Sequence, residues 1–226
     1  MCRAVGCHPE CMHPLTTLDE VADLIGRRAA SVPRLIVGIA GQPGSGKSTV
    51  AAHVVGLLGP SAQVLPMDGF HLPQARLVEL GRRDRMGAPD TFDIVGFVGV
   101  IRGLRQGGSL NAPGFNRVIE EPVPGDVCIA ADTGVVLVEG NYLLHGGDGW
   151  QATHDLLDLR FYLDVDPVIR RERLVARHIR FGKSPAVARR WVFGPDEATS
   201  RLIAATAGRA DYVVRLDESK NLAGGA

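Results

Sequence analysis

Apolar positions along the chain follow two patterns, one typical of helices and one typical of buried strands. Residues 16–30 carry apolar side chains three or four positions apart behind the capping candidates Thr16 and Thr17, which predicts a packing helix. The same spacing predicts helices at residues 47–58, 74–82, 94–105, 166–180, 185–194 and 196–207. Short apolar runs predict strands at residues 35–40, 63–66, 135–138, 161–165 and 212–214.

Strands that alternate with helices imply an α/β fold with a mostly parallel sheet that binds ligands beyond the carboxyl ends of its strands. Residues 107–126 break the pattern, because glycine and proline are frequent there and no period emerges. We expect a loop with short strands at most, of the kind that often holds substrates. The 226 residues are predicted to form one domain over residues 16–217, with tails at 1–15 and 218–226.

Composition and charge exclude several classes of protein. Apolar residues make up 45% and charged residues 22%, which is typical of a folded chain and not of a disordered one. The 25 basic side chains balance the 25 acidic ones, so no net charge recruits nucleic acid or an anionic membrane. No apolar run approaches the roughly 18 residues of a membrane helix, and the N-terminus does not resemble a secretory signal. We expect a cytoplasmic monomer or homodimer.

Cysteine usage adds little chemistry. Cys2, Cys7 and Cys11 lie near the N-terminus with a spacing unlike that of a closed zinc site, which favours a flexible tail over a metal site. Cys128 stands alone among apolar residues and is predicted to be a small buried side chain. No disulfide framework is implied.

The clearest motif is a glycine-rich loop between the first predicted strand and the helix that follows it. Residues 41–48 read GQPGSGKS and match the G-x-x-x-x-G-K-[ST] pattern of a phosphate-binding loop. Its glycines let backbone N–H groups point at phosphate oxygens, and the helix N-terminus adds partial positive charge. Lys47 is predicted to reach the β and γ phosphates, Ser48 to bind Mg²⁺ and Thr49 to contact the α-phosphate region. The predicted ATP-binding residues of this segment are Gly41, Gly44, Ser45, Gly46, Lys47, Ser48 and Thr49.

Glu139 follows the apolar run of residues 135–138, where a phosphate-loop protein carries the acidic residue of its Walker B motif. A carboxylate at that position can hold Mg²⁺ through a water molecule and help to neutralise the transferring phosphoryl group. Ser48 and Glu139 are therefore the predicted metal residues. The alternative for Glu139 is a strand-end carboxylate that caps a turn.

A phosphate loop alone does not separate kinases from GTPases or transporter ATPases. The chain has no Asn-Lys-x-Asp guanine-reading motif, but Asp68 follows the second predicted strand, where it would lie beside the γ-phosphate. A carboxylate there can accept the proton of an acceptor hydroxyl without a shifted pKa, because positioning does most of the work in phosphoryl transfer. Asp68 is therefore the predicted catalytic base, with Lys47 beside it in catalysis. An ordinary Asp-Gly turn is the alternative.

Four arginines lie at helical spacing in residues 166–180. Arg170, Arg173, Arg177 and Arg180 share one face of the predicted helix. As a lid over the nucleotide, this face would add positive charge and exclude water. Arg173 is predicted to act in catalysis, and Arg170 and Arg177 to bind ATP. A solvated basic face is the alternative.

At these motifs the sequence resembles the phosphoribulokinase and uridine kinase family of P-loop kinases, most of all a bacterial branch of nucleoside/nucleotide kinase-like proteins, some of them named fructose transport system kinases. The similarity covers about residues 35–214 and rests on segments 41–48, 66–71, 87–93, 138–144 and 163–180. It implies a P-loop NTPase fold, a three-layer α/β/α sandwich with an arginine-rich lid, and ATP-dependent transfer to a small-molecule hydroxyl with Asp68 as the base.

Three segments depart from the family's usual sequences. Residues 87–89 read Gly-Ala-Pro in place of the Asp-His-Pro run of uridine kinases, and Asn116 replaces the acid of a Pro-x-[FY]-Asp-Arg run. Residues 194–201 differ from an Asn-rich Pro-Asn-Ala stretch, while residues 85–89 are closer to type I pantothenate kinases, whose additional length the chain lacks. Contacts with the acceptor are therefore expected to differ from those of relatives.

For the acceptor we expect contacts from polar residues on loops next to the predicted strands and helices. The predicted substrate-binding residues are His71, Arg83, Asp93, Arg117 and Tyr142. The basic run Arg82, Arg83 and Arg85 fits an anionic or polyhydroxyl substrate as well as it fits solvated loop positions.

Two functions remain open at this point. The favoured one is an ATP-dependent small-molecule kinase, a phosphotransferase that acts on a hydroxyl of a nucleoside, sugar or related alcohol. The other is an ATP-binding regulatory or transport-associated module without metabolite kinase activity. Asp68 discriminates between them, because only the kinase needs a base opposite the phosphate loop.

Overall fold

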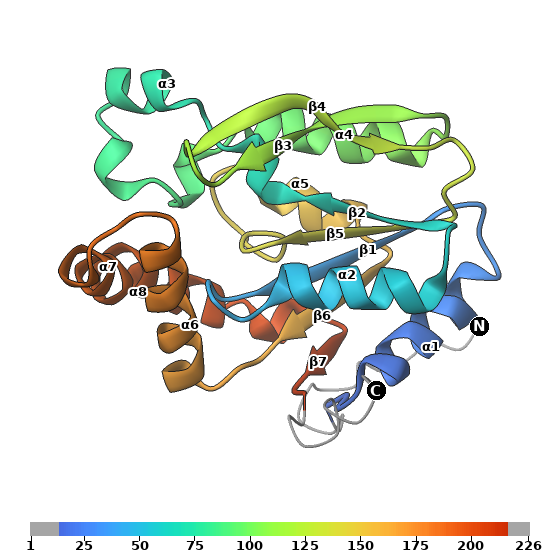
Figure 1. The fold of residues 1–226 in the computed structure, drawn as a ribbon. Helices are drawn as coiled ribbons and strands as arrows, with labels where there is room; N and C mark the ends of the chain where they lie inside the picture. The colour runs from blue at the N-terminus through green and yellow to red at the C-terminus, as the bar shows by residue number, and fades with distance from the viewer. Residues whose placement is uncertain (1–13, 217–226) are drawn as a thin grey trace.

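A five-stranded parallel sheet forms the centre of the computed structural model, which describes residues 14–216 (Figure 1). The strand order is β2-β5-β1-β6-β7. The strands are β1 (Leu35–Gly41), β2 (Ala62–Pro66), β5 (Val135–Gly140), β6 (Leu159–Leu163) and β7 (Tyr212–Val214). All five predicted strands are confirmed to within a few residues, and the predicted α/β fold with them. Cys2, Cys7 and Cys11 lie outside the described residues.

Helices cover both faces of the sheet and make three layers (Figure 1). The helices of these layers are α1 (Leu18–Ala29), α2 (Lys47–Leu58), α4 (Ile94–Arg105) and α5 (Gln151–Leu156). Alternate side chains of a strand point to opposite faces, so Val37 of β1 packs in the core beneath α1 and α2, whereas Ile36 packs in the core beneath α4 and α5. Because both faces are covered, every residue of β1 is buried.

Side-chain caps fix where several helices begin. The Thr17 hydroxyl accepts a hydrogen bond from the Glu20 N–H, and the Glu20 carboxylate accepts one from the Thr17 N–H, so α1 begins with a reciprocal capping box. The Asp93 carboxylate accepts from the Gly96 N–H at the start of α4. Predicted starts at residues 47 and 94 are confirmed.

A long antiparallel hairpin replaces the loop predicted at residues 107–126. It consists of β3 (Leu110–Asn116) and β4 (Glu121–Ile129), packed beside β2 and α4 (Figure 1). Proline usually argues against a strand, so Pro113 and Pro122 led the sequence analysis to predict a loop here. A two-stranded ribbon tolerates proline because each of its strands has one free edge. The buried position predicted for Cys128 is also wrong, because its side chain lies on an exposed part of β4.

The lid region lies at the carboxyl end of the sheet (Figure 1). It consists of α6 (Pro167–Arg180), α7 (Pro185–Trp191), a π-helical turn (Val192–Asp196) and α8 (Glu197–Ala204). The predicted helix at residues 185–194 thus ends earlier, where the π-helical turn begins. The short helix α3 (Gln74–Glu79) lies beside the hairpin turn. No helix within residues 14–216 is both long and apolar enough to cross a bilayer.

Candidate active site

The phosphate loop joins β1 to α2 and is shaped by two glycines in left-handed conformations. Gly44 has φ 79° and Gly46 has φ 90°, and a Cβ at Gly44 would stand 2.5 Å from the Arg170 carbonyl oxygen of α6. The Lys47 ammonium group lies inside the loop and donates to the carbonyl oxygens of Gly41 (3.0 Å) and Gln42 (3.1 Å). Phosphate oxygens can replace these carbonyls as acceptors, so the loop fits an anionic phosphate chain.

Burial lowers the pKa of Lys47 to about 8, although the charges of Glu139 and Asp68 oppose that shift. An ammonium group in such surroundings gains most from a ligand that brings negative charge to it. Its position at the start of α2 adds the partial positive charge of the helix N-terminus to the same point.

Ser48 and Glu139 form the candidate metal centre. The Ser48 hydroxyl donates to Glu139 Oε1 across 2.8 Å, and Glu139 is buried at the end of β5. Both are oxygen ligands of the kind that Mg²⁺ takes. Burial raises the pKa of Glu139, and the nearby charge of Asp68 raises it further, so the pair favours a cation beside it. Within residues 14–216 no cluster of three or more His, Cys, Asp or Glu side chains could hold a metal ion by itself. Phosphate oxygens and water would therefore complete the shell of a magnesium ion at Ser48 and Glu139.

Asp68 lies in the 3-10 turn Met67–Phe70, directly after β2. Pro66 and Glu139 are register partners in neighbouring strands, so Asp68, two residues after Pro66, and Glu139 lie at adjacent strand ends. Arg117 Nη2 donates to Asp68 Oδ2 across 2.6 Å. Burial alone would raise the pKa of Asp68, but the positive charge of Arg117, with smaller contributions from other basic groups, outweighs it and the pKa lies below its ordinary value. Asp68 is thus an ionised, partly buried carboxylate.

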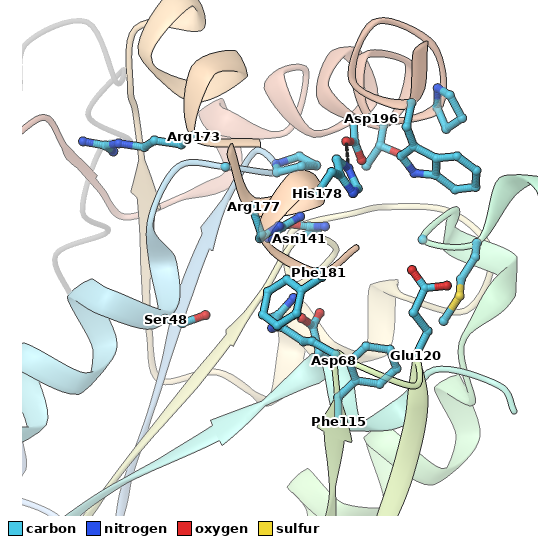
Figure 2. Close-up of a pocket in the computed structure, with 18 of the residues that line it drawn as sticks. Ser48, Asp68, Phe115, Glu120, Asn141, Arg173, Arg177, His178, Phe181 and Asp196 are labelled. Atoms are coloured by element: carbon cyan, nitrogen blue, oxygen red, sulfur yellow. Dashed lines mark hydrogen bonds and ion pairs between the residues drawn. The ribbon is translucent and has the colours of Figure 1, made fainter. Parts of the chain in front are cut away.

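One cavity of about 670 Å³ contains the phosphate loop, the metal centre and Asp68. In Figure 2 the labelled residues Ser48 and Glu120 lie on opposite sides of Asp68, and His178 and Asp196 line the part near Glu120. We call this part of the cavity, which lies on the other side of Asp68 from the phosphate loop and is lined by Glu120, His178 and Asp196, the acceptor end. A reacting pair of molecules could therefore meet at Asp68.

The lid arginines divide into two groups instead of acting as one stripe. Arg173, Arg177 and Arg180 line the cavity, and Arg173 Nη1 lies 3.8 Å from the point where a Cβ of Gly46 would stand. Arg170 does not line the cavity. Its side chain is buried behind the phosphate loop, where it donates to the Pro43 carbonyl oxygen (3.3 Å) and to Glu197 (2.9 Å). The structure thus places Arg170 against the loop and the other three arginines in the lining of the cavity.

The predicted substrate-binding residues also fall into two groups, those that line the cavity and those that do not. His71, Arg83 and Arg117 line the cavity. Asp93 is exposed and occupied in capping α4, and Tyr142 is buried outside the lining, where its hydroxyl donates to the Gly87 carbonyl oxygen (2.5 Å). Neither of these two side chains reaches the cavity.

Several residues that line the cavity were not among the site residues predicted from the sequence. They come from the hairpin, the end of β5 and the lid: Phe115, Glu120, Asn141, His178, Phe181, Lys183, Asp196 and Thr199. Glu120 forms the most extensive contacts among them, because its carboxylate accepts from Arg83 (2.5 Å) and from Lys183 (2.8 Å). Glu120 has φ 52°, a left-handed conformation that is unusual for a residue with a side chain, so the hairpin turn presents it under some strain. No local sequence signal marks it.

The sequence is similar to a kinase family and to individual proteins named as kinases. Residues 36–218 match the family described as "Phosphoribulokinase / Uridine kinase family". A Schizosaccharomyces pombe protein provisionally named a uridine kinase is 34% identical over 163 residues, which cover 66% of this chain and 68% of that protein. A pantothenate kinase of Leifsonia xyli subsp. xyli is 31% identical over 152 residues, which cover 64% of this chain and 47% of that enzyme.

Among solved structures, a Silicibacter sp. TM1040 protein provisionally named a fructose transport system kinase has the same fold. It is 33% identical, with a TM-score of 0.80, and the match covers 88% of this chain and 98% of that chain. The names of these relatives point to different acceptors.

Proposed function

Since the chain belongs to the phosphoribulokinase and uridine kinase family of ATP-dependent P-loop kinases, we propose that it transfers the γ-phosphate of Mg-ATP to a hydroxyl group of a nucleoside, sugar or related alcohol. The observation that carries this proposal is the position of Asp68. It is an ionised carboxylate that faces the same cavity as the phosphate loop and the Ser48–Glu139 pair. A module that only binds ATP has no need of a base at this point.

ATP would lie with its phosphates in the loop of residues 41–48, held by the backbone N–H groups and by Lys47. The Ser48 hydroxyl and the Glu139 carboxylate would hold Mg²⁺, which neutralises charge on the phosphates. Arg173 and Arg177 come to the same cavity from α6 and would add positive charge from the opposite side.

In the transfer step the acceptor hydroxyl would lie at the acceptor end, with its oxygen directed at the γ-phosphorus. A bond forms between this oxygen and phosphorus while the bond from phosphorus to the bridging oxygen of ADP breaks. The hydroxyl proton passes to Asp68, and the leaving ADP keeps the electron pair of the broken bond. Arg117 keeps Asp68 ionised and oriented, so the base is ready before the acceptor arrives.

The experiment measures ADP formed by the full chain with Mg-ATP and a panel of alcohols, including uridine, D-fructose, D-ribose and pantothenate, each compared with the rate without acceptor. Asp68→Asn is expected to lower acceptor-dependent ADP formation by a factor of 10² or more and to leave ATP affinity within about threefold. Lys47→Ala weakens ATP binding under either function and serves as the control for nucleotide binding.

Unchanged turnover in Asp68→Asn would reject the assigned base. If no alcohol raises ADP formation while ATP still binds tightly, the regulatory or transport-associated module is the better description.

A further inference from the structure

The imidazole of His71 is held rigidly at the acceptor end, next to the proposed base. Its ring lies between Phe92 and Phe115, with centroid distances of 4.0 Å and 4.7 Å. The His71 backbone forms a bridge with Phe92, and its N–H donates to the Asp68 carbonyl oxygen at 3.2 Å. Both His71 and Asp68 line the cavity. Since the ring cannot turn freely, the direction of its polar atoms is fixed.

A backbone carbonyl fixes the proton position on this ring. His71 Nδ1 lies 2.8 Å from the Asp68 carbonyl oxygen, and a carbonyl oxygen can only accept a hydrogen bond, so Nδ1 carries the proton. Burial lowers the pKa of His71, although the charge of Asp68 opposes this, so the ring is neutral near neutral pH. Nε2 then presents a lone pair, and no residue in the range 14–216 donates a hydrogen bond to it.

The charged groups around this lone pair already have partners. Asp68 is paired with Arg117, and Glu120 is paired with Arg83 and Lys183. The Asp196 carboxylate is hydrogen-bonded to His178. A ligand at this point therefore meets charged groups that already have partners, and one neutral hydrogen-bond acceptor, Nε2 of His71, that has no donor. A hydroxyl group satisfies that acceptor by donating its proton, whereas a carboxylate or phosphate oxygen cannot.

We propose that His71 accepts, through Nε2, a hydrogen bond from a second hydroxyl of the acceptor, so that the site selects a diol or polyol over an alcohol with one hydroxyl. This inference rests on the proposed kinase function. One hydroxyl gives its proton to Asp68 while the second is anchored by His71, and the molecule is held in one orientation for attack. A bound acceptor without the second hydroxyl would cover Nε2 and exclude water from it without giving it a hydrogen-bond donor, which is the basis of strong discrimination.

The first test compares acceptors that differ by one hydroxyl in the full chain with Mg-ATP. Uridine is paired with 2′-deoxyuridine and 3′-deoxyuridine, and D-ribose with 2-deoxy-D-ribose. For the best acceptor, loss of the anchored hydroxyl is expected to lower kcat/KM by about 10²-fold. His71→Phe keeps an aromatic ring between Phe92 and Phe115 but removes the acceptor atom, and it should abolish most of this discrimination. His71→Gln, whose amide oxygen can reach the position of Nε2, should restore part of it.

The second test reads the ring directly and needs no acceptor. Nitrogen NMR of the full chain at pH 7.5, with His71→Phe used to assign the signal, is expected to show protonated Nδ1 and bare Nε2. The opposite tautomer or a protonated ring would overturn the role of His71.

The outcomes separate this inference from the function beneath it. If alcohols raise ADP formation but the wild type and His71→Phe discriminate alike, the role of His71 alone is wrong. If no alcohol raises ADP formation, the proposed function fails and this role fails with it. Should His71→Phe not fold, His71→Gln assigns the NMR signal instead, and the tautomer of the wild type together with the deoxy acceptors still decides.

Discussion

Arg117 donates a 2.6 Å hydrogen bond to Asp68, and this contact ties the turn of the β3–β4 hairpin to the end of β2. The two residues are 49 positions apart in the sequence. Asp68 is partly buried beside the hairpin, which raises its pKa, and the close positive charge of Arg117 opposes this and keeps the carboxylate ionised. The hairpin therefore belongs to the site as much as the phosphate loop does.

Arg117→Ala is expected to raise the pKa of Asp68, because burial then acts on the carboxyl without the main opposing charge. A base must be ionised to accept a proton, so the acid limb of the kcat/KM profile should move to higher pH. We expect the loss of kcat/KM to be roughly tenfold larger at pH 5.5 than at pH 8.

The control is Arg117→Lys, which keeps the charge but not the planar guanidinium and should shift the profile less. Carbon NMR of labelled aspartate carboxyls, assigned with Asp68→Asn, gives the same pKa without an acceptor. An acid limb and an NMR titration that both stay in place would contradict the role of Arg117.

Gly69 lets the backbone of the hairpin approach the base. A Cβ at Gly69 would stand 1.9 Å from the Pro113 carbonyl oxygen and 2.6 Å from its carbonyl carbon, so the backbone of β3 would have to move. Gly69→Ala is expected to lower the free energy of unfolding by about 2–4 kcal/mol. It should also lower acceptor-dependent turnover more than ATP affinity, because the displaced contact is the one between the hairpin and Asp68.

The matched control is Gly99→Ala, since nothing lies within 4 Å of a Cβ at that position in the interior of α4. It should raise stability by about 0.5–1 kcal/mol. Urea unfolding monitored by circular dichroism measures both variants, and equal stability of Gly69→Ala and the wild type would show that the hairpin is not packed against the turn.

The sequence reveals most of the central sheet and the nucleotide end of the site, because both depend on local patterns. Strand β1 is a run of apolar residues covered on both faces, and Lys47 and Ser48 lie in a motif whose spacing is set by backbone geometry. The position of Asp68 beside the phosphate loop could be predicted for the same reason, since strand ends of a parallel sheet meet at one edge.

The acceptor end depends on contacts between distant segments, which no local pattern encodes. Glu120 meets Lys183, 63 positions away, and Gln74 meets Ile119 through a side chain and a backbone carbonyl. Arg170 fits the helical stripe of basic residues, but α6 packs against the phosphate loop at this residue, so its side chain lies behind the loop and not in the cavity. The spacing of residues shows which of them share one face of a helix, but it does not show which segment that face packs against.

Glu120 and Lys183 connect the hairpin turn to the turn between α6 and α7, across 2.8 Å. Glu120→Gln should weaken this connection by about 0.5–1 kcal/mol, because both side chains are partly exposed. Amide exchange in residues 181–191 is then expected to be about twofold to fivefold faster, which hydrogen exchange with mass spectrometry measures. Arg76→Ala breaks an exposed pair with Glu79 on α3 and should leave these residues unchanged. Equal exchange in Glu120→Gln and the wild type would show that the lid is held elsewhere.

Glu197 binds Arg170 and Arg171 and so connects α8 to the helix that supports the phosphate loop. Hydrogen bonding from Arg171, with further contributions from Arg170, lowers the pKa of Glu197 from 4.5 to about 2. A carboxyl whose pKa is lower in the folded than in the unfolded protein stabilises fully above the unfolded pKa, and this contribution is lost as the pH falls toward the folded pKa. Glu197 should therefore stabilise the fold at neutral pH by on the order of 2–3 kcal/mol, lost between about pH 4.5 and pH 2.

Glu197→Gln removes this contribution and leaves the buried guanidinium of Arg170 without its carboxylate. Its Tm at pH 7 is expected to lie roughly 5 °C or more below that of the wild type, and the difference should shrink as the pH falls below 4.5. Calorimetry from pH 7 to pH 3 measures both curves. Asp155→Asn, which removes an exposed carboxylate beside His154, is the control and should lower Tm by no more than about 2 °C. A Tm difference for Glu197→Gln that stays constant down to pH 3 would mean that packing, and not the charge of Glu197, connects α8 to α6.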